Sequence, residues 1–319
     1  MTAFLKRGAL CAAAVGLAGG TGMISPASAT EIQRVVSPGG IEAWLVTERT
    51  VPLVAMTFAF RGGAAQDPDG KEGLAQMVSS LLDEGAGELD DDAFQRRMED
   101  AAVRLTFNAT RDNLMGELRT LSRNRDEGFE LLRLAVNAPR FDEAPVERIR
   151  AQLLARLRAR LEDPEDMASR AWSGAAFPGH PYGRPSAGTL ASVSAITRDD
   201  LRDYQRRVFA RSDLKIAVVG DIDAATLAPV LDKVFGGLPE RSDLRPIPET
   251  SVHNAGDRRV IEVNVPQTVI QFGGPGLKRS DPDFIPAFVV NHILGGGSFT
   301  SRLYEEVREK RGLAYSVYA

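Results

Sequence analysis

The chain has 319 residues, of which 43% are hydrophobic and 26% charged, proportions typical of a soluble globular protein. This length allows two domains of roughly 150–200 residues each. A formal net charge of −4 gives no electrostatic reason to expect nucleic acid or an anionic membrane as a partner.

The first 29 residues have the parts of a secretory signal peptide. Lys6 and Arg7 form a positive region, residues 8–20 are apolar but too short to favour a membrane anchor, and Ala27–Ala29 supply an A-x-A cleavage site. The only cysteine, Cys11, follows a leucine, whereas a lipoprotein signal would place a small residue there. We therefore expect cleavage near Ala29, a periplasmic location, no membrane span after cleavage and no cysteine chemistry.

Residues 30–238 form the first predicted domain. β-Branched and aromatic runs predict strands at residues 40–48, 51–60 and 214–223, and a strand pair within 103–121. Periodic apolar residues and capping signals predict helices at residues 74–83, 90–101, 125–136, 144–161, 198–208 and 224–235.

Residues 239–257 contain three prolines and no apolar period, and we interpret them as an interdomain linker. Residues 258–319 then repeat the order of the first domain: strand, glycine-rich turn, helix, glycine break, helix and strand. In both halves a helix ends in Leu-x-x-Gly, at Leu82–Gly85 and at Leu294–Gly297. The first copy continues far beyond this point, so we expect the second domain, residues 258–319, to be truncated, with unpaired strand edges.

The second half carries the most specific motif, "LGGGSFTSRLYEEVREKRGLAYSVYA" at residues 294–319. Together with residues 60–75, 177–189 and 218–223, it resembles the M16 metallopeptidases, the family of pitrilysin, insulinase and mitochondrial processing peptidase. The resemblance covers residues 31–319. It implies an α+β fold of tandem M16-type domains, each a mainly antiparallel sheet covered by helices, with the second domain incomplete.

Active members of this family carry an H-x-x-E-H motif on a first-domain helix. Residues four apart share a helix face, so two histidines can bind one zinc ion while the glutamate activates water. In this sequence the matching positions are Gln76, Ser79 and Ser80. The third zinc ligand of the family, a glutamate, would fall near Ala155 or Arg156. We therefore expect this chain to bind no metal or other cofactor.

The three histidines show no metal-ligand spacing. We interpret His180 as a structural loop residue, His253 as a solvated linker residue and His292 as a packed residue of a core helix. A serine hydrolase is not favoured either, because the sequence has no G-x-S-x-G elbow.

Arg308 and Tyr315 are the remaining candidate site residues. Their spacing alone favours a solvated Arg308 paired with Glu305 or Glu306, and a Tyr315 packed in a strand. The resemblance instead implies that they match the family's Arg/Tyr pair, which hydrogen-bonds the bound peptide near its scissile carbonyl. Such donors can stabilise developing negative charge.

The resemblance implies a split heterodimeric peptidase as the leading hypothesis. This chain would be the non-catalytic, peptide-binding subunit, and would supply Arg308 and Tyr315 to an active site on an M16 partner that carries H-x-x-E-H and the zinc. Extended peptides or unfolded polypeptide would bind by strand addition. The alternatives are an inactive scaffold or assembly protein and an inactive fragment.

Overall fold

The computed structural model describes residues 31–319, so the predicted signal peptide lies outside the described residues. Residues 33–220 contain a six-stranded sheet with the order β1-β2-β6-β3-β5-β4. The strands are β1 (Gln33–Val36), β2 (Glu42–Thr47), β3 (Leu53–Arg61), β4 (Arg104–Ala109), β5 (Asn113–Leu121) and β6 (Lys215–Gly220). The β2–β6 pair is parallel and the other pairs are antiparallel, which confirms the predicted mainly antiparallel sheet.

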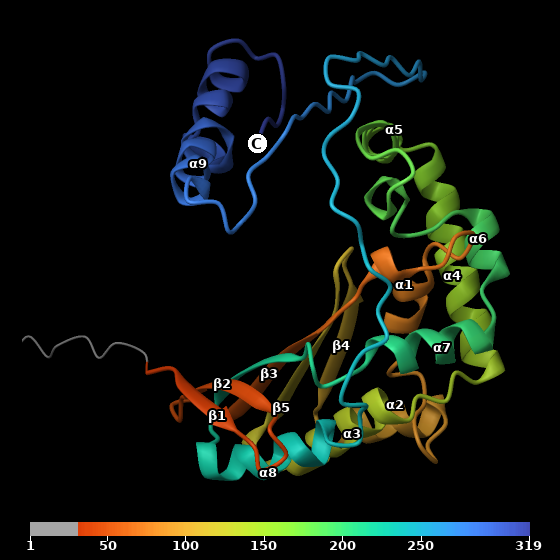
Figure 1. The fold of residues 1–319 in the computed structure, drawn as a ribbon, viewed down its shortest axis with the longest axis vertical. Coiled ribbons are helices and arrows are strands. Elements are labelled where there is room, and N and C mark those ends of the chain that lie inside the picture. Colours follow the sequence, from red (N-terminus) through yellow and green to blue (C-terminus); the bar gives the residue numbers. More distant parts are fainter. Residues whose placement is uncertain (1–30) are drawn as a thin grey trace, which may run out of the picture.

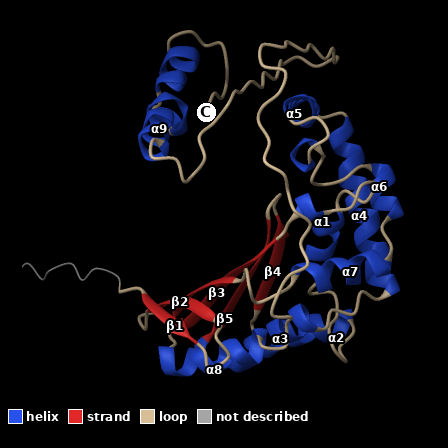
Figure 2. Ribbon diagram, viewed as in Figure 1, coloured by secondary structure: helices blue, strands red, loops and turns tan. Residues whose placement is uncertain are grey.

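Helices cover one face of this sheet (Figures 1 and 2). The helices of the first domain are α1 (Leu74–Ser79), α2 (Asp91–Asp100), α3 (Arg125–Asn137), α4 (Glu143–Leu161), α5 (Pro164–Ala176), α6 (Leu190–Ala195), α7 (Arg198–Val208) and α8 (Ala224–Phe235). α3 packs against α8 and β5, α8 against β1, and α1 against β4. No helix within residues 31–319 has the length and apolar character needed to cross a membrane.

The strands show why only one face is covered. In β3, Val54, Met56, Phe58 and Phe60 are buried and alternate with more exposed residues, as the two-residue period of a strand requires. The opposite face leaves large side chains partly open to solvent: Trp44, Leu53, Met115 and Val219. The core therefore lies between the sheet and the helices, and the other face of the sheet is open.

Capping residues fix several helix starts. Thr197 and Asp200 form the capping box predicted for α7, and the Asp90 carboxylate accepts a hydrogen bond from the backbone of Ala93 at the start of α2. α5 and α6 were not predicted, although Asp163 and Thr189 cap their first turns and the apolar residues of α5 recur at helical spacing.

The predicted linker is attached to the first domain along much of its length. Buried Gln66 exchanges two hydrogen bonds with the backbone of Arg245: its Nε2 donates to the carbonyl at 3.0 Å, and its Oε1 accepts from the N–H at 2.8 Å. Further on, the N–H of His253 donates to the carbonyl of Ala176 at 2.9 Å. We call residues 239–254 the strap.

Residues 258–319 differ from the sequence-based expectation. They contain α9 (Phe284–Asn291) and two π-helical stretches, His292–Gly296 and Tyr304–Glu309, but no strand. Only Gly295, Ser301 and Tyr304 are buried. The strands expected near residues 258–272 and 313–319 were wrong because, among the described residues, no neighbouring strand satisfies their backbone groups.

Candidate functional site

Helix α1 places Gln76, Ser79 and Ser80 together at the end of a short helix. The Oγ atoms of Ser79 and Ser80 both donate to the carbonyl oxygen of Gln76, at 2.9 and 3.0 Å, and the Nε2 of Gln76 donates to Ser80 Oγ at 3.5 Å. Ser79 is buried, whereas Gln76 and Ser80 are half-buried. The three polar side chains are therefore engaged mainly with one another and with the end of their own helix.

The start of α1 is fixed by a buried carboxylate that the sequence analysis missed. Asp67 accepts hydrogen bonds from the backbone N–H groups of Gly73 and Ala75, both at 2.9 Å. Burial raises the pKa of Asp67 to about 7, although these N–H donors and the nearby Arg184 act in the opposite direction. The signal was available in the Asp-Pro pair before a glycine-bounded helix start.

Helix α4 offers no third ligand. Leu153 and Leu157 are buried, whereas Ala155 and Arg156 are exposed. No acidic residue lies between Glu147 and Glu162. An amide, two hydroxyls and a guanidinium or methyl group do not form a zinc donor set. Within residues 31–319, no group of three or more His, Cys, Asp or Glu side chains is placed to hold a metal ion.

The histidines occupy three different environments. His180 is buried; its Nδ1 accepts from the N–H of Tyr182 at 3.1 Å, so its Nε2 is the atom that donates to the carbonyl of Pro248 at 3.0 Å. This confirms the structural interpretation of His180. His253 is exposed in the strap, as expected. The interpretation of His292 as a packed residue was wrong: it is exposed because no sheet covers α9 within the described residues.

The structure brings Arg308 and Tyr315 together. The guanidinium carbon of Arg308 lies 4.8 Å from the ring centroid of Tyr304 and 4.9 Å from that of Tyr315. Arg308 also donates to the Tyr304 hydroxyl. Glu305 and Glu306 pair instead with Lys310 and Arg311. The Arg308–glutamate pair is therefore not formed, and Tyr315 is 83% exposed in irregular structure rather than packed in a strand.

Arg308 and the α1 positions do not meet in the described chain. No hydrogen bond or ion pair connects residues 284–319 with residues 31–238. Figure 1 shows the segment that contains α9 apart from the sheet. The positions predicted from the sequence thus form two separate groups, one on α1 and one around Arg308.

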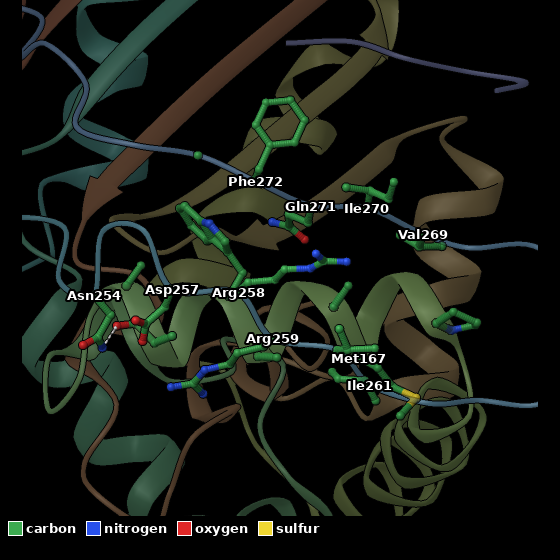
Figure 3. A pocket seen from close by; sticks show the side chains of 18 of the residues that line it. Met167, Asn254, Asp257, Arg258, Arg259, Ile261, Val269, Ile270, Gln271 and Phe272 are labelled. Carbon is green, nitrogen blue, oxygen red and sulfur yellow. Dashed lines mark hydrogen bonds between the residues drawn. The ribbon is translucent and has the colours of Figure 1, made fainter. Parts of the chain in front are cut away.

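A third feature, a cavity of about 570 Å³, lies between α5 and residues 252–273. Figure 3 shows residues 258–261 and 269–272 alongside α5, with Met167 of the helix facing the same space. The small face of α5 at Ala168, Ala171 and Ala175 permits this close approach. This cavity is not predictable from the sequence without α5, which forms one of its walls.

Two family descriptions match successive parts of the chain. "Insulinase (Peptidase family M16)" matches residues 45–190, and "Peptidase M16 inactive domain" matches residues 195–319. These matches, together with the six-stranded sheet and its covering helices, define the class of protein as M16-type. The chain belongs to the M16 peptidase family.

The relatives include proteins named as peptidases and proteins named as non-peptidase homologs. The "Non-peptidase homolog YmxG" of Helicobacter pylori is 29% identical over 84% of this chain, and an uncharacterized zinc protease of Streptomyces coelicolor is 26% identical over 90%. The crystal structure of a peptidase M16 inactive domain from Pseudomonas fluorescens superposes with a TM-score of 0.77 at 27% identity, covering 90% of this chain and 70% of the other. The chain spans 62% and 64% of the length of the first two relatives.

Proposed function

We propose that this chain is a non-catalytic, peptide-binding subunit of a heterodimeric M16 zinc peptidase in the periplasm. One observation carries the proposal. Helix α1 is retained and well packed, while Gln76, Ser79 and Ser80 stand where a zinc site would need two histidines and a glutamate. The name of the Helicobacter pylori relative, a non-peptidase homolog, supports a chain without proteolytic activity of its own.

Arg308 and Tyr315 would supply chemistry to an active site on the partner subunit. The Arg308 side chain forms no ion pair within residues 31–319, and the two tyrosine rings hold its guanidinium by cation–π contacts. A guanidinium whose charge is not neutralised by a carboxylate can donate to a peptide carbonyl and to the oxyanion that develops from it. The exposed hydroxyl of Tyr315 is a second donor.

The edge of the first-domain sheet supports peptide binding. β4 is the last strand beside β5, and it packs against α1. Its outer backbone groups are free to pair with an extended chain, and the Arg104 side chain is exposed there. A peptide added at this edge would run close to the helix that in catalytic relatives carries zinc, so the zinc-bearing partner must complete the reaction.

A proteolytically inactive scaffold or assembly protein is the second candidate. The same loss of the zinc ligands and the same non-peptidase relative favour it. The two functions differ in what Arg308 does, because a scaffold needs no donor at a scissile carbonyl.

The test uses the mature chain alone and mixed with an M16 partner that carries H-x-x-E-H. We expect no stoichiometric zinc and no peptidase activity from the chain alone, and activity from the mixture. Zinc bound in a one-to-one ratio, or activity without the partner, contradicts both candidates. A stable complex whose peptidase activity does not depend on this chain favours the scaffold.

A further inference from the structure

A polar cavity of about 580 Å³ lies at the β1–β2 side of the sheet, and no residue of α1 or of residues 258–319 lines it. Its walls come from the turn before β2, the starts of β2 and β6, the loop that precedes β6 and the first residues of the strap. In Figure 1 these elements meet near α8. The cavity is thus separate from the features that support the proposed function.

Three cationic side chains line this cavity, and none forms an ion pair within residues 31–319: Arg211, Lys215 and Arg241. Arg211 also has a buried Nε atom without a hydrogen-bond acceptor in the described chain. Three cations without carboxylate partners favour an anion in the cavity, which would accept from their accessible N–H groups.

Two carboxylates lie in the same walls. Glu42 is neutralised by Arg34, whose guanidinium lies 2.6 Å from its carboxylate oxygen, and Arg34 lowers the pKa of Glu42 mainly by this hydrogen bond. Glu240 has no cationic partner within 4.0 Å among the described residues. A third carboxylate, that of Asp232, contacts Gly39 in the same wall, so with Arg34 included four cations face three carboxylates, an excess of one positive charge. The charge in the cavity therefore favours an anion.

The walls are fixed before any ligand arrives. The N–H groups of Arg211 and Ser212 donate to the carbonyls of Pro239 and Glu240, both at 2.9 Å, which attaches the strap to the loop before β6. On the other side, the carboxylate of Asp232 accepts from the N–H of Gly39 at 2.9 Å and holds the turn before β2. A preformed site loses less conformational entropy when it binds.

Trp44 adds an aromatic surface. Its side chain belongs to the open face of the sheet and is 50% exposed, and it lines the cavity together with Lys215. Trp44 is opposite Ala217 in the parallel β2–β6 pair, two residues from Lys215, so both belong to the same face. An indole ring with this exposure can stack on a planar organic group.

We propose that this cavity binds a small phosphate monoester with a planar ring, the phosphate against Arg211, Lys215 and Arg241 and the ring against Trp44. A phosphate monoester carries close to two negative charges at neutral pH. Arginine forks match its oxygens, and lysine adds a point charge. This site goes beyond peptide binding and would operate whether the chain serves a peptidase or a scaffold.

Fluorescence tests the proposal because the chain has two tryptophans. In the Trp172→Phe variant, Trp44 is the only source of tryptophan fluorescence. We expect phenyl phosphate, titrated at low ionic strength, to change its emission saturably. Lys215→Gln and Arg241→Gln remove exposed charges without disturbing the core, so each should weaken binding by roughly tenfold or more, the effect of one charge-assisted hydrogen bond. Arg211→Gln should weaken it at least as much.

The matched control is Arg96→Gln, which removes an exposed charge from α2, outside the cavity, and should leave binding unchanged. Inorganic phosphate should compete, but more weakly than phenyl phosphate because it has no ring. The proposal is overturned if no saturable change occurs, if benzyl alcohol gives the same change, or if Arg96→Gln weakens binding as much as Lys215→Gln. Equal competition by inorganic phosphate overturns the role of Trp44.

Discussion

The guanidinium carbon of Arg308 lies 4.9 Å from the ring centroid of Tyr315. The same carbon lies 4.8 Å from the ring centroid of Tyr304. A cation held in this way keeps its N–H donors oriented without a carboxylate that would compete with a substrate. The pair is therefore a preorganised donor group in a segment that is otherwise mostly exposed.

The first prediction concerns this pair in the complex with a zinc-bearing partner. Arg308→Ala should lower kcat/KM for peptide cleavage by at least about tenfold, because one charge-assisted donor to the transition state is lost. Arg311→Ala is the control, since Arg311 is an exposed arginine of the same segment that pairs with Glu306. Equal activity of the Arg308→Ala and unmodified complexes would refute the role.

Two substitutions of Tyr315 separate the contribution of its aromatic ring from that of its hydroxyl. Tyr315→Phe keeps the cation–π surface and should cost less activity than Tyr315→Leu, which removes both. The measurement is again kcat/KM of the complex. If Phe and Leu are equally impaired, the hydroxyl is the group that acts and the ring contact is incidental.

A second prediction concerns the buried carboxylate before α1. Asp67→Ala leaves the N–H groups of Gly73 and Ala75 without acceptors and should lower the free energy of unfolding by about 1–3 kcal/mol. Urea unfolding measures it. Asp69→Ala, two residues away with a fully exposed side chain, should change stability by less than about 0.5 kcal/mol. Similar losses for both variants would show that Asp67 does not support the helix.

The third prediction is a pH dependence. The hydrogen bond from Arg133, together with Lys233, lowers the pKa of Glu130 to about 2. Because this folded-state pKa lies below the unfolded value, the native state binds fewer protons between about pH 4.5 and 2. The stabilisation is therefore present above pH 4.5 and is lost as the pH falls toward 2.

Glu130→Gln checks this dependence. The substitution should cost about 1 kcal/mol at pH 7, discounted for the partial exposure of the pair, and almost nothing near pH 2. Glu99→Gln is the control, because Glu99 is exposed on α2 and forms no ion pair among the described residues. A cost for Glu130→Gln that does not change with pH would contradict the ion-pair explanation.

A fourth prediction addresses the strap. Gln66→Ala removes both hydrogen bonds to Arg245 and should speed tryptic cleavage after exposed Arg241. Gln205→Ala is matched, since Gln205 also donates to a backbone carbonyl, that of Val136, but does not touch the strap. Faster cleavage after Arg241 in both variants would point to general destabilisation instead.

The sequence predicted well those elements whose pattern is local. The alternation of Val54 to Phe60 and the capping box at Thr197 are both readable from neighbouring residues, and both are confirmed. The four-residue strand β1 was missed because so short a run has almost no pattern. Residues 258–272 have a strand-like sequence, but a strand also needs a partner, and none of the described strands pairs with them.

The part of the candidate site that depends on local sequence motifs was likewise predictable. The identities at Gln76, Ser79 and Ser80 follow from a motif, and so do Arg308 and Tyr315. Gln66 and the Arg211 cavity depend on residues far apart in sequence, such as Gln66 and Arg245. Contacts of this kind come from packing, which no single window of the sequence contains.

The attachment of the strap has a mechanical consequence. A proline-rich connection would ordinarily serve as the pivot between two halves of a chain. Here, however, residues 239–254 are anchored by Gln66, by His180 and by the bonds from His253 to Ala176 and from Asn254 to Ala175, and residues 258–273 then lie alongside α5. Any swing of the segment that carries Arg308 must therefore begin after the last of these anchors. The tether that bends is shorter than the sequence suggests, which raises the effective concentration of Arg308 around the first domain.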